Sequence, residues 1–444
     1  MKYILFATLA TFAVVVSLLI TCGPMIRAEQ IPLRFLPRAH TANETIIHTF
    51  VSLSHGGYIP SSDLLAGEHG PFYGTTVEGS RHNGGVAFSL TPPAASGGTW
   101  TETILSNFEE AVSPSAVISG ADGSLYGTTF GGGSSGCFCG YVFKLTPRAR
   151  GSRWTKQVLY TFHGHPDGEQ AGEALLPDGH GGFYGTTTLG GTGPCGSFGC
   201  GTVFEVDPPR ARQNSWTEII IHSFTYADGS SPRGHLIADS AGDLFGVTGD
   251  GGAYNVGTVY KLTPPSSGSG DWSESVLHDF SGTGGDGASP ASGLLADASG
   301  ALYGTTTLGG AAPGGFGTVF KLSPPRHGSG SWTERILYAF TSVNGDGNQP
   351  YSDLIADRHG ALYGTTLTGG NSCRIPGCGI VFKLSPPQAK SAMWTETVLH
   401  EFSDDPDGSG PKAGLTPGLH GLLYGTTTRG GGTENGGTVF ELLP

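Results

Sequence analysis

Five aspartates occur about one repeat apart in the chain, and each stands directly before a glycine. They are Asp167, Asp228, Asp286, Asp346 and Asp407. Carboxylates at equivalent positions could come together to bind the hydroxyl groups of a ligand or a cation. The alternative is structural, because aspartate accepts hydrogen bonds from its own backbone and glycine accommodates the positive φ of a tight turn. The residues alone leave both interpretations open.

Two of these aspartates lie in short stretches that partly match a calcium loop. The first stretch runs from Asn344 to Asn348 and the second from Asp404 to Asp407. Calcium prefers alternating oxygen ligands along one loop, and both stretches are incomplete in that respect. We therefore predict no cofactor, with calcium as the alternative.

Six of the seven cysteines lie in pairs in three glycine-rich loops: Cys137 and Cys139, Cys195 and Cys200, Cys373 and Cys378. An even number of cysteines in an exported chain favours disulfides, and pairing within each loop is the simplest arrangement. Only one residue separates Cys137 from Cys139, so a bridge there would be strained and a redox or cross-loop role is the alternative. Zinc is disfavoured because no histidine recurs beside the pairs.

Four aromatic residues lie in or near these loops, or in the corresponding loop of another repeat: Phe138, Phe198, Tyr254 and Phe316. On rigid loops they could stack on sugar rings or grip a peptide. They could equally be buried against their own loops. Together with the five aspartates they form the predicted ligand-binding set, and no catalytic residue can be named from the sequence.

A repeat that spans almost the whole chain must position these residues. A Tyr/Phe-Gly-Thr-Thr element, or a close variant, recurs seven times, 53 to 61 residues apart. Each copy is followed by a glycine-rich loop, a Gly-x-Val-Phe-Lys-Leu-like segment and a proline-rich turn. In six copies a Trp-Thr-Glu-like segment that closes on a phenylalanine comes next. The 76 glycines follow this long period and not a three-residue one, which excludes collagen.

Each repeat contains four short segments with strand character. In one repeat they are 234–238, 244–248, 257–262 and 272–280. These segments are rich in β-branched and aromatic residues, and no long stretch shows helical periodicity. Four strands per repeat, seven times over, predict an all-β fold, a seven-bladed β-propeller. We expect the tyrosine of Tyr-Gly-Thr-Thr to pack between blades, and its glycine to let a neighbouring backbone approach closely.

The phase of the repeat predicts how the ring closes. The chain ends in a third strand, whereas segment 44–50 corresponds to an outer strand, so the N-terminal strand would complete the last blade and leave no unpaired edge. We predict a signal peptide at 1–28, a linker at 29–43 and a single propeller at 44–444. The blades are expected at about 57–108, 112–162, 168–224, 229–280, 287–340, 347–402 and 408–444 with 44–50.

These elements resemble the GloVer (Gloeobacter–Verrucomicrobia) tandem repeat. The residues that carry the resemblance include Leu125 to Thr129, Gly317 to Leu322 and Trp332 to Glu334. It covers nearly the whole mature chain and implies an exported, often surface-attached bacterial protein of undefined molecular function. The order of segments is also similar to that of kelch propellers, which implies that the tryptophan strand is outermost.

The first 28 residues are typical of a secretory signal peptide. A basic start precedes the apolar stretch 3–20, and cleavage is expected after Ala28. The alternative is cleavage before Cys22 with a lipid anchor, since 19–22 resembles a lipobox. We therefore expect a secreted or cell-surface protein without a transmembrane span in its mature form.

The charge balance excludes one class of partner. The chain carries 23 basic and 36 acidic side chains, a formal net charge of −13, and no run of lysine or arginine. Nucleic-acid binding requires basic groups that neutralise phosphates, so we exclude it. An anionic polymer is also disfavoured as a ligand unless a metal mediates the contact.

No sequence motif identifies a catalytic apparatus. The chain has no His-Glu-x-x-His, and no Gly-x-Ser-x-Gly elbow comes with a credible triad. We therefore expect a monomeric, exported binding scaffold that contacts a glycan or a surface protein through its loop face. The alternatives are a secreted propeller enzyme, a lyase or hydrolase acting on a carbohydrate, and a purely structural envelope protein.

Overall fold

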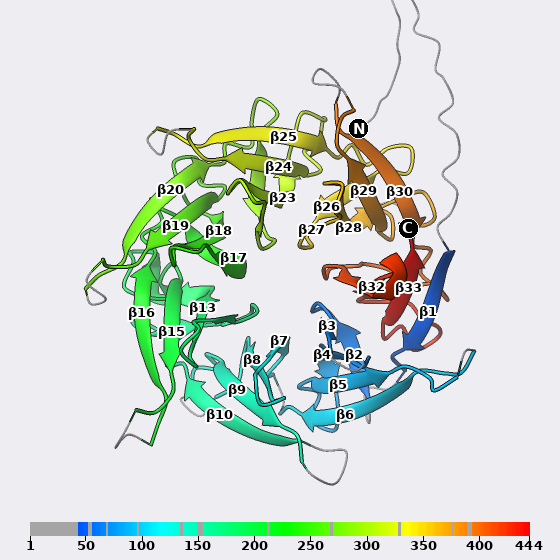
Figure 1. Ribbon diagram of the computed structural model, residues 1–444, viewed down its shortest axis with the longest axis horizontal. Helices are drawn as coiled ribbons and strands as arrows, with labels where there is room; N and C mark the ends of the chain where they lie inside the picture. The colour runs from blue at the N-terminus through cyan, green and yellow to red at the C-terminus, as the bar shows by residue number, and fades with distance from the viewer. Residues whose placement is uncertain are drawn as a thin grey trace, which may run out of the picture. The chain divides into compact units, whose positions relative to one another are not determined.

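Seven blades, each built on a sheet of four or five strands, are arranged around a central axis in the computed structural model (Figure 1), so the predicted all-β seven-bladed propeller is confirmed. The structure describes residues 43–444 apart from 52–55, 68–69, 96, 110, 134–135, 149–153, 211–213, 267–269, 327–329, 375 and 389–392. The predicted signal peptide, the lipid-anchor site at Cys22 and positions 29–42 of the predicted linker lie outside the described residues. Asn43, the last residue of that linker, is already the first residue of β1.

Each blade runs from an inner strand beside the axis to an outer strand at the rim. Blade 1 contains β2 (Gly57–Pro60), β3 (Leu65–Ala66), β4 (Phe72–Gly79), β5 (Val86–Thr91) and β6 (Thr101–Asn107). Blade 2 contains β7 (Pro114–Ser119), β8 (Leu125–Thr129), β9 (Tyr141–Thr146) and β10 (Thr155–Thr161). Blade 3 contains β11 (Gly168–Glu169), β12 (Leu176–Pro177), β13 (Phe183–Thr187), β14 (Leu189–Gly190), β15 (Thr202–Asp207) and β16 (Thr217–Ser223).

The remaining blades repeat this order. Blade 4 contains β17 (Ser230–Ala238), β18 (Leu244–Asp250), β19 (Thr258–Thr263) and β20 (Ser273–Asp279). Blade 5 contains β21 (Gly287–Pro290), β22 (Leu295–Ala296), β23 (Leu302–Gly309), β24 (Thr318–Ser323) and β25 (Thr333–Ala339). Blade 6 contains β26 (Gly347–Pro350), β27 (Ile355–Ala356), β28 (Leu362–Gly369), β29 (Ile380–Ser385) and β30 (Thr395–Glu401). Blade 7 contains β31 (Thr416–Pro417), β32 (Leu423–Thr427), β33 (Thr438–Leu443) and β1 (Asn43–Thr49). Two short 3₁₀ turns are η1 (Gly196–Phe198) and η2 (Leu419–Gly421).

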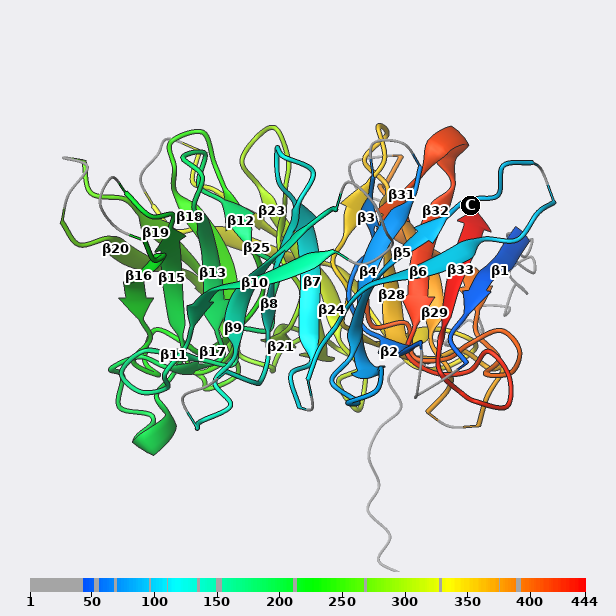
Figure 2. The same cartoon turned by 90° about the horizontal axis from the view of Figure 1, so that it is seen from below.

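The inner strand is interrupted in several blades. In blade 1, β2 and β3 both pair with β4, and residues 61–64 between them form no ladder. The side view in Figure 2 shows β2 and β11 toward one face of the propeller, with β3 and β31 toward the opposite face. The unpaired middle segments therefore lie part-way along the channel, where their side chains are available to something other than the sheet.

Aromatic residues join each blade to the next. The phenylalanine that closes an outer strand packs edge-to-face on the aromatic residue of the next blade's third strand, with ring centroids 5.0 to 5.2 Å apart. All seven interfaces contain this pair, and Phe50 with Phe88 is the copy that joins blade 7 to blade 1. Such a pair contributes roughly 0.5–1.5 kcal/mol beyond the burial of its apolar area.

The glycine of Tyr-Gly-Thr-Thr is explained by the same aromatic residues. Gly74 pairs with Phe88 across the β4–β5 ladder, and a Cβ at Gly74 would lie 2.6 Å from the Phe88 ring. The space that we expected a neighbouring backbone to occupy is therefore taken by the ring of the blade's own third strand. The tyrosine does pack between blades, since Tyr73 contacts Trp154 of blade 2 with ring centroids 5.9 Å apart.

The N-terminal strand forms part of the last sheet. β1 pairs antiparallel with β33 from Asn43 opposite Leu443 to Thr49 opposite Thr438, and the sheet order is β1-β33-β32-β31. Figure 1 shows the two ends of the described chain side by side at this blade.

Candidate functional site

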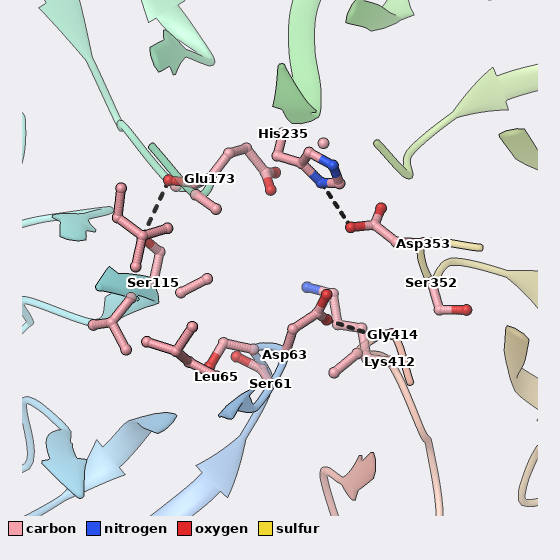
Figure 3. A pocket seen from close by; sticks show the side chains of 18 of the residues that line it. Ser61, Asp63, Leu65, Ser115, Glu173, His235, Ser352, Asp353, Lys412 and Gly414 are labelled. Carbon is pink, nitrogen blue, oxygen red and sulfur yellow. Dashed lines mark hydrogen bonds and ion pairs between the residues drawn. The ribbon is translucent and has the colours of Figure 1, made fainter. Parts of the chain in front are cut away.

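A cavity of about 390 Å³ lies on the propeller axis, where the interrupted inner strands of the blades converge (Figure 3). Its wall is partly apolar, with Val117, Ile118 and Leu236 among the lining residues. Five charged side chains from five different blades also line it: Asp63, Glu173, His235, Asp353 and Lys412. Serine hydroxyls add further polar groups: Ser61, Ser62, Ser115 and Ser352.

An ion pair between blades 4 and 6 crosses part of this cavity. Nδ1 of His235 lies 2.7 Å from Oδ2 of Asp353, and the two side chains keep 34% and 22% of their surface exposed to the channel. The carboxylate charge of Asp353 raises the pKa of His235 to about 9 against the opposing effect of burial. Burial favours the neutral form of Asp353, but the His235 charge holds the pKa of Asp353 below its usual range. Both members are thus charged near neutral pH.

The other two carboxyl groups hold protons more tightly than usual. Burial, with a smaller contribution from Asp353, raises the pKa of Glu173 to about 7. The same two causes, in the same order, raise the pKa of Asp63 above its ordinary value. The carboxyl group of Asp63 also accepts a hydrogen bond from the backbone N–H of Gly414 at 2.6 Å. Three carboxyl groups in one cavity repel one another when all are ionised, so Glu173 takes up a proton near pH 7 and Asp63 near pH 6.

Glycines at one repeat position make room for these side chains. In five of the seven blades the residue before the leucine of the inner strand is Asp63, His235, Gly293, Asp353 or Gly414. A Cβ on Gly414 would lie 2.9 Å from Asp63, and a Cβ on Gly293 would overlap the ring of His235. A polar side chain from one blade therefore folds over a glycine of another, and the backbone N–H of Gly293 donates a hydrogen bond to Asp353.

Sequence reasoning missed this cavity because it searched the loops, where the repeats differ in length. Part of the signal that could have found it is this one inner-strand position, which carries a charged residue in three blades and glycine or alanine in the others. Glu173 and Lys412 lie one and two residues before the equivalent position in their own blades. A charged residue directly before a buried leucine is unusual on an inner strand that serves only to build the fold.

The five predicted aspartates do not line the cavity. Each accepts hydrogen bonds from its own connection between blades, as when Asp228 accepts from the Thr225 N–H at 2.8 Å and Asp346 from the Thr341 N–H at 2.7 Å. The other three make the same kind of contact: Asp167 with the His163 N–H, Asp286 with the Ser281 N–H and Asp407 with the Ser403 N–H. These contacts fit the turn interpretation, and a ligand-binding role for the five stays a prediction.

The predicted loop aromatics divide into two groups. Phe138, Phe198 and Tyr254 are exposed, at 62%, 61% and 60% of their surface. Phe316 is partly buried and packs against the core between blades 5 and 6. The three loops that contain cysteines are closed by disulfides, since each predicted pair is joined: Cys137–Cys139, Cys195–Cys200 and Cys373–Cys378.

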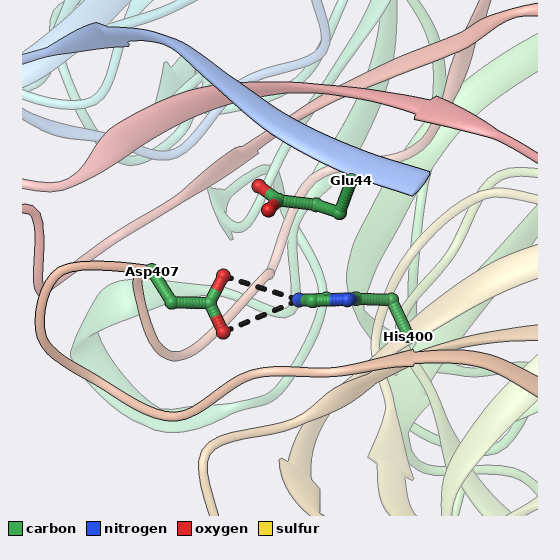
Figure 4. Close-up of side chains that lie close together, drawn as sticks. All are labelled: Glu44, His400 and Asp407. Atoms are coloured by element: carbon green, nitrogen blue, oxygen red, sulfur yellow. Dashed lines mark hydrogen bonds and ion pairs between the residues drawn. The ribbon is translucent and has the colours of Figure 1, made fainter. Parts of the chain in front are cut away.

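A second kind of acidic cluster lies between the outer strands (Figure 4). Nε2 of His400 is 3.1 Å from Oδ1 of Asp407, and Glu44 of β1 approaches the same two groups. Ligand atoms of Glu44, His400 and Asp407 lie within 4.8 Å of one another, close enough to hold a metal ion. The same holds for two further triads: His278 with Asp286 and Glu334, and Asp178 with Glu205 and Asp207.

The repeat explains the outer clusters without a metal. Four blades carry histidine at this outer-strand position, whereas blades 2 and 5 carry tyrosine and blade 1 carries serine. Tyr160 still donates a hydrogen bond to Asp167 at 3.0 Å. The aspartate and the outer-strand glutamate thus recur where the metal-ligating histidine does not. Calcium at the stretches around Asp346 and Asp407 stays a prediction, although the turn already uses oxygens of both carboxylates.

Comparison with known proteins gives a family and a fold. The family described as the Gloeobacter/Verrucomicrobia repeat matches residues 35–213 and 193–440. No curated protein sequence matches the chain. Among solved structures, a streptogramin B lyase is similar with a TM-score of 0.51 and 13% identity, over 90% of this chain and 97% of that one. A polysaccharide lyase, an ulvan lyase bound to -[GlcA(1-4)Rha3S]-, is similar with a TM-score of 0.50 and 10% identity, over 88% of this chain and 95% of that one.

Proposed function

We propose, from the premise that this chain belongs to the Gloeobacter/Verrucomicrobia repeat family, that it binds a sugar residue of a carbohydrate in its central cavity. The observation that carries the proposal is the convergence of Asp63, Glu173, His235, Asp353 and Lys412 on one cavity from five blades. The likeness to two lyases concerns the propeller fold alone and does not enter the argument.

The chemistry of the wall suits a ligand with many hydroxyl groups. A hydroxyl both donates and accepts hydrogen bonds, and the cavity offers carboxylates that accept, a lysine and a histidine that donate, and serines that do both. The apolar patch formed by Val117, Ile118 and Leu236 can contact the C–H face of a sugar ring. A volume of about 390 Å³ is within the range of small-ligand sites.

Glu173→Ala tests the proposal. Carbohydrates are first screened on an array, and the affinity of the best ligand is then measured by calorimetry for the native protein and the variant. We expect binding to weaken about tenfold or more, because the variant leaves a buried polar group of the ligand without its partner, which costs roughly 1–3 kcal/mol. Circular dichroism checks that the variant is folded. An array on which no carbohydrate binds the native protein contradicts the proposal.

A second candidate function is supported by the exposed loop aromatics. Phe138, Phe198 and Tyr254 lie on the loops between second and third strands, and disulfides close the first two of these loops. The face they occupy could hold a glycan chain or a surface protein by stacking. In the calorimetry above, Phe198→Ala is the matched variant: loss of binding in Phe198→Ala with full binding in Glu173→Ala favours the loop face.

Catalysis is the alternative that the cavity itself favours. A carboxyl group with a pKa of about 7, such as Glu173, can act as a general acid or base at neutral pH. A charged His235–Asp353 pair faces the same space. A lyase or hydrolase function would appear as turnover of the bound oligosaccharide that Glu173→Gln abolishes while the oligosaccharide still binds.

Export of a monomeric protein is part of the same proposal. Three disulfides support export, because such bonds form and persist in oxidising compartments. Within the described residues, no helix has the length and apolar character needed to cross a membrane.

A further inference from the structure

Lys412 is the basic side chain of the cavity that lacks a counter-ion. It extends from the inner segment of blade 7, and its ammonium lies over the ring of Tyr351 of blade 6, 4.8 Å from the ring centroid. Among the described residues no carboxylate oxygen lies within 4.0 Å of its nitrogen, whereas His235 is paired with Asp353. A cation held in place by an aromatic ring but left unpaired inside a cavity is suited to an anionic group of a ligand.

The surrounding carboxyl groups do not cancel this charge under all conditions. The titratable groups that line the cavity are Asp63, Glu173, His235, Tyr351, Asp353 and Lys412. His235 and Asp353 compensate each other, which leaves Lys412 against Asp63 and Glu173. When these two carboxyl groups are protonated, the cavity carries a net charge of one positive unit, and the carboxyl groups donate hydrogen bonds to an anion where carboxylates would repel it.

We propose that the ligand of the cavity is an acidic sugar, a uronic acid residue whose carboxylate pairs with Lys412, and that its binding takes up protons on Glu173 and Asp63. This inference rests on the proposed function, carbohydrate binding in the same cavity. It concerns one local site, so it is compatible with the acidic net charge of the whole chain, which disfavours binding of an anionic polymer along the surface.

Proton uptake is supported by the two carboxyl groups themselves. Burial raises the pKa of Glu173 to about 7 and raises the pKa of Asp63 in the same direction. A ligand carboxylate that requires a protonated partner binds up to about tenfold more weakly for each pH unit above the pKa of that partner. The affinity for a uronic acid should therefore fall as the pH rises, while the affinity for a neutral sugar should change less.

The experiment compares glucuronate and galacturonate with glucose and galactose, by calorimetry or ligand-observed NMR on the intact protein, near pH 5.5 and near pH 8. We expect the uronates to bind about tenfold or more tightly than the neutral sugars at the lower pH, and this preference to shrink about tenfold at the higher pH. Lys412→Gln should weaken uronate binding far more than neutral-sugar binding, so that the two affinities become similar.

Lys383→Gln is the matched control. Lys383 also lies over a tyrosine ring, 5.2 Å from the centroid of Tyr363, but it does not line the cavity. This variant should bind both sugar classes as the native protein does. Uronates that bind no tighter than neutral sugars, or a Lys412→Gln variant that weakens both classes equally, overturn the inference and leave the proposed function standing. A native protein that binds neither class at either pH overturns both.

Discussion

The folded protein is expected to be markedly less stable at about pH 8.5 than at about pH 5.5, with a thermal unfolding midpoint lower by at least about 5 °C. The reason is a carboxyl pair that recurs at five of the seven blade interfaces. Each pair contains the aspartate of the connection and a glutamate of the next outer strand: Asp167 with Glu218, Asp228 with Glu274, Asp286 with Glu334, Asp346 with Glu396 and Asp407 with Glu44.

The glutamates of these pairs favour the protonated form in the folded state. Burial first, and then the nearby aspartate in four of the five, raise the pKa of Glu274 and Glu334 to about 7 and of Glu218 and Glu396 to about 8. For Glu44 burial raises the pKa to about 7 against the opposing charge of His400. In all five glutamates, Oε1 is buried without a hydrogen-bond partner.

The sign of the effect follows from proton linkage. A group whose pKa is raised on folding binds its proton more tightly in the folded state, so its contribution is complete below the unfolded pKa of 4.5 and is lost as the pH rises toward 7 to 8. The lowered pKa values of Asp228 and Asp286 change the stability only at acid pH, below the range from about pH 5.5 to about pH 8.5. The side chains are partly exposed, so solvent screening reduces each contribution.

Differential scanning calorimetry across this pH range is the measurement. The double variant Glu218→Gln with Glu396→Gln should flatten the dependence, because an uncharged amide resembles the protonated acid at all pH values. Glu434→Gln, a change at an exposed loop residue, should leave the slope as it is. A midpoint that stays constant or rises toward pH 8.5 in the native protein contradicts the assignment of protonated glutamates.

Phe50→Ala is expected to destabilise the protein by about 3–5 kcal/mol, the usual cost of removing a buried phenylalanine ring. Phe50 is 1% exposed, and its ring packs edge-to-face on Phe88 with centroids 5.2 Å apart. It follows directly on β1, the strand that pairs with β33. Loss of this ring removes the aromatic contact between blades 7 and 1, so the two ends of the described chain are held mainly by one ladder.

Urea unfolding followed by tryptophan fluorescence gives the free energy of unfolding for this comparison. Val51→Ala is the matched control, since Val51 is adjacent in the chain but 57% exposed, and it should change stability little. A Phe50→Ala variant as stable as the Val51→Ala variant would show that the blade 7 and blade 1 interface does not depend on this aromatic pair.

The predictability of each feature depended on how far apart its parts lie in the chain. The strands of blade 4 could be predicted closely: β20 lies within the expected 272–280, although β17 begins at Ser230, before the expected 234. The disulfides were also accessible, because Cys195 and Cys200 are close in sequence. The reason predicted for the glycine of Tyr-Gly-Thr-Thr was wrong, since Gly74 faces the ring of Phe88 and not a neighbouring backbone.

The sequence by itself determined the architecture, because each blade's strands, turns and apolar residues are specified within one repeat of roughly sixty residues, and seven repeats close a ring. Only the tertiary structure decided the candidate site. Asp63 belongs to blade 1 and His235 to blade 4, far apart in the chain. They face a common cavity with Asp353 of blade 6 only because the blades surround one axis. Their charge states depend on burial and on the distances between these side chains, and both are set only after the ring has formed.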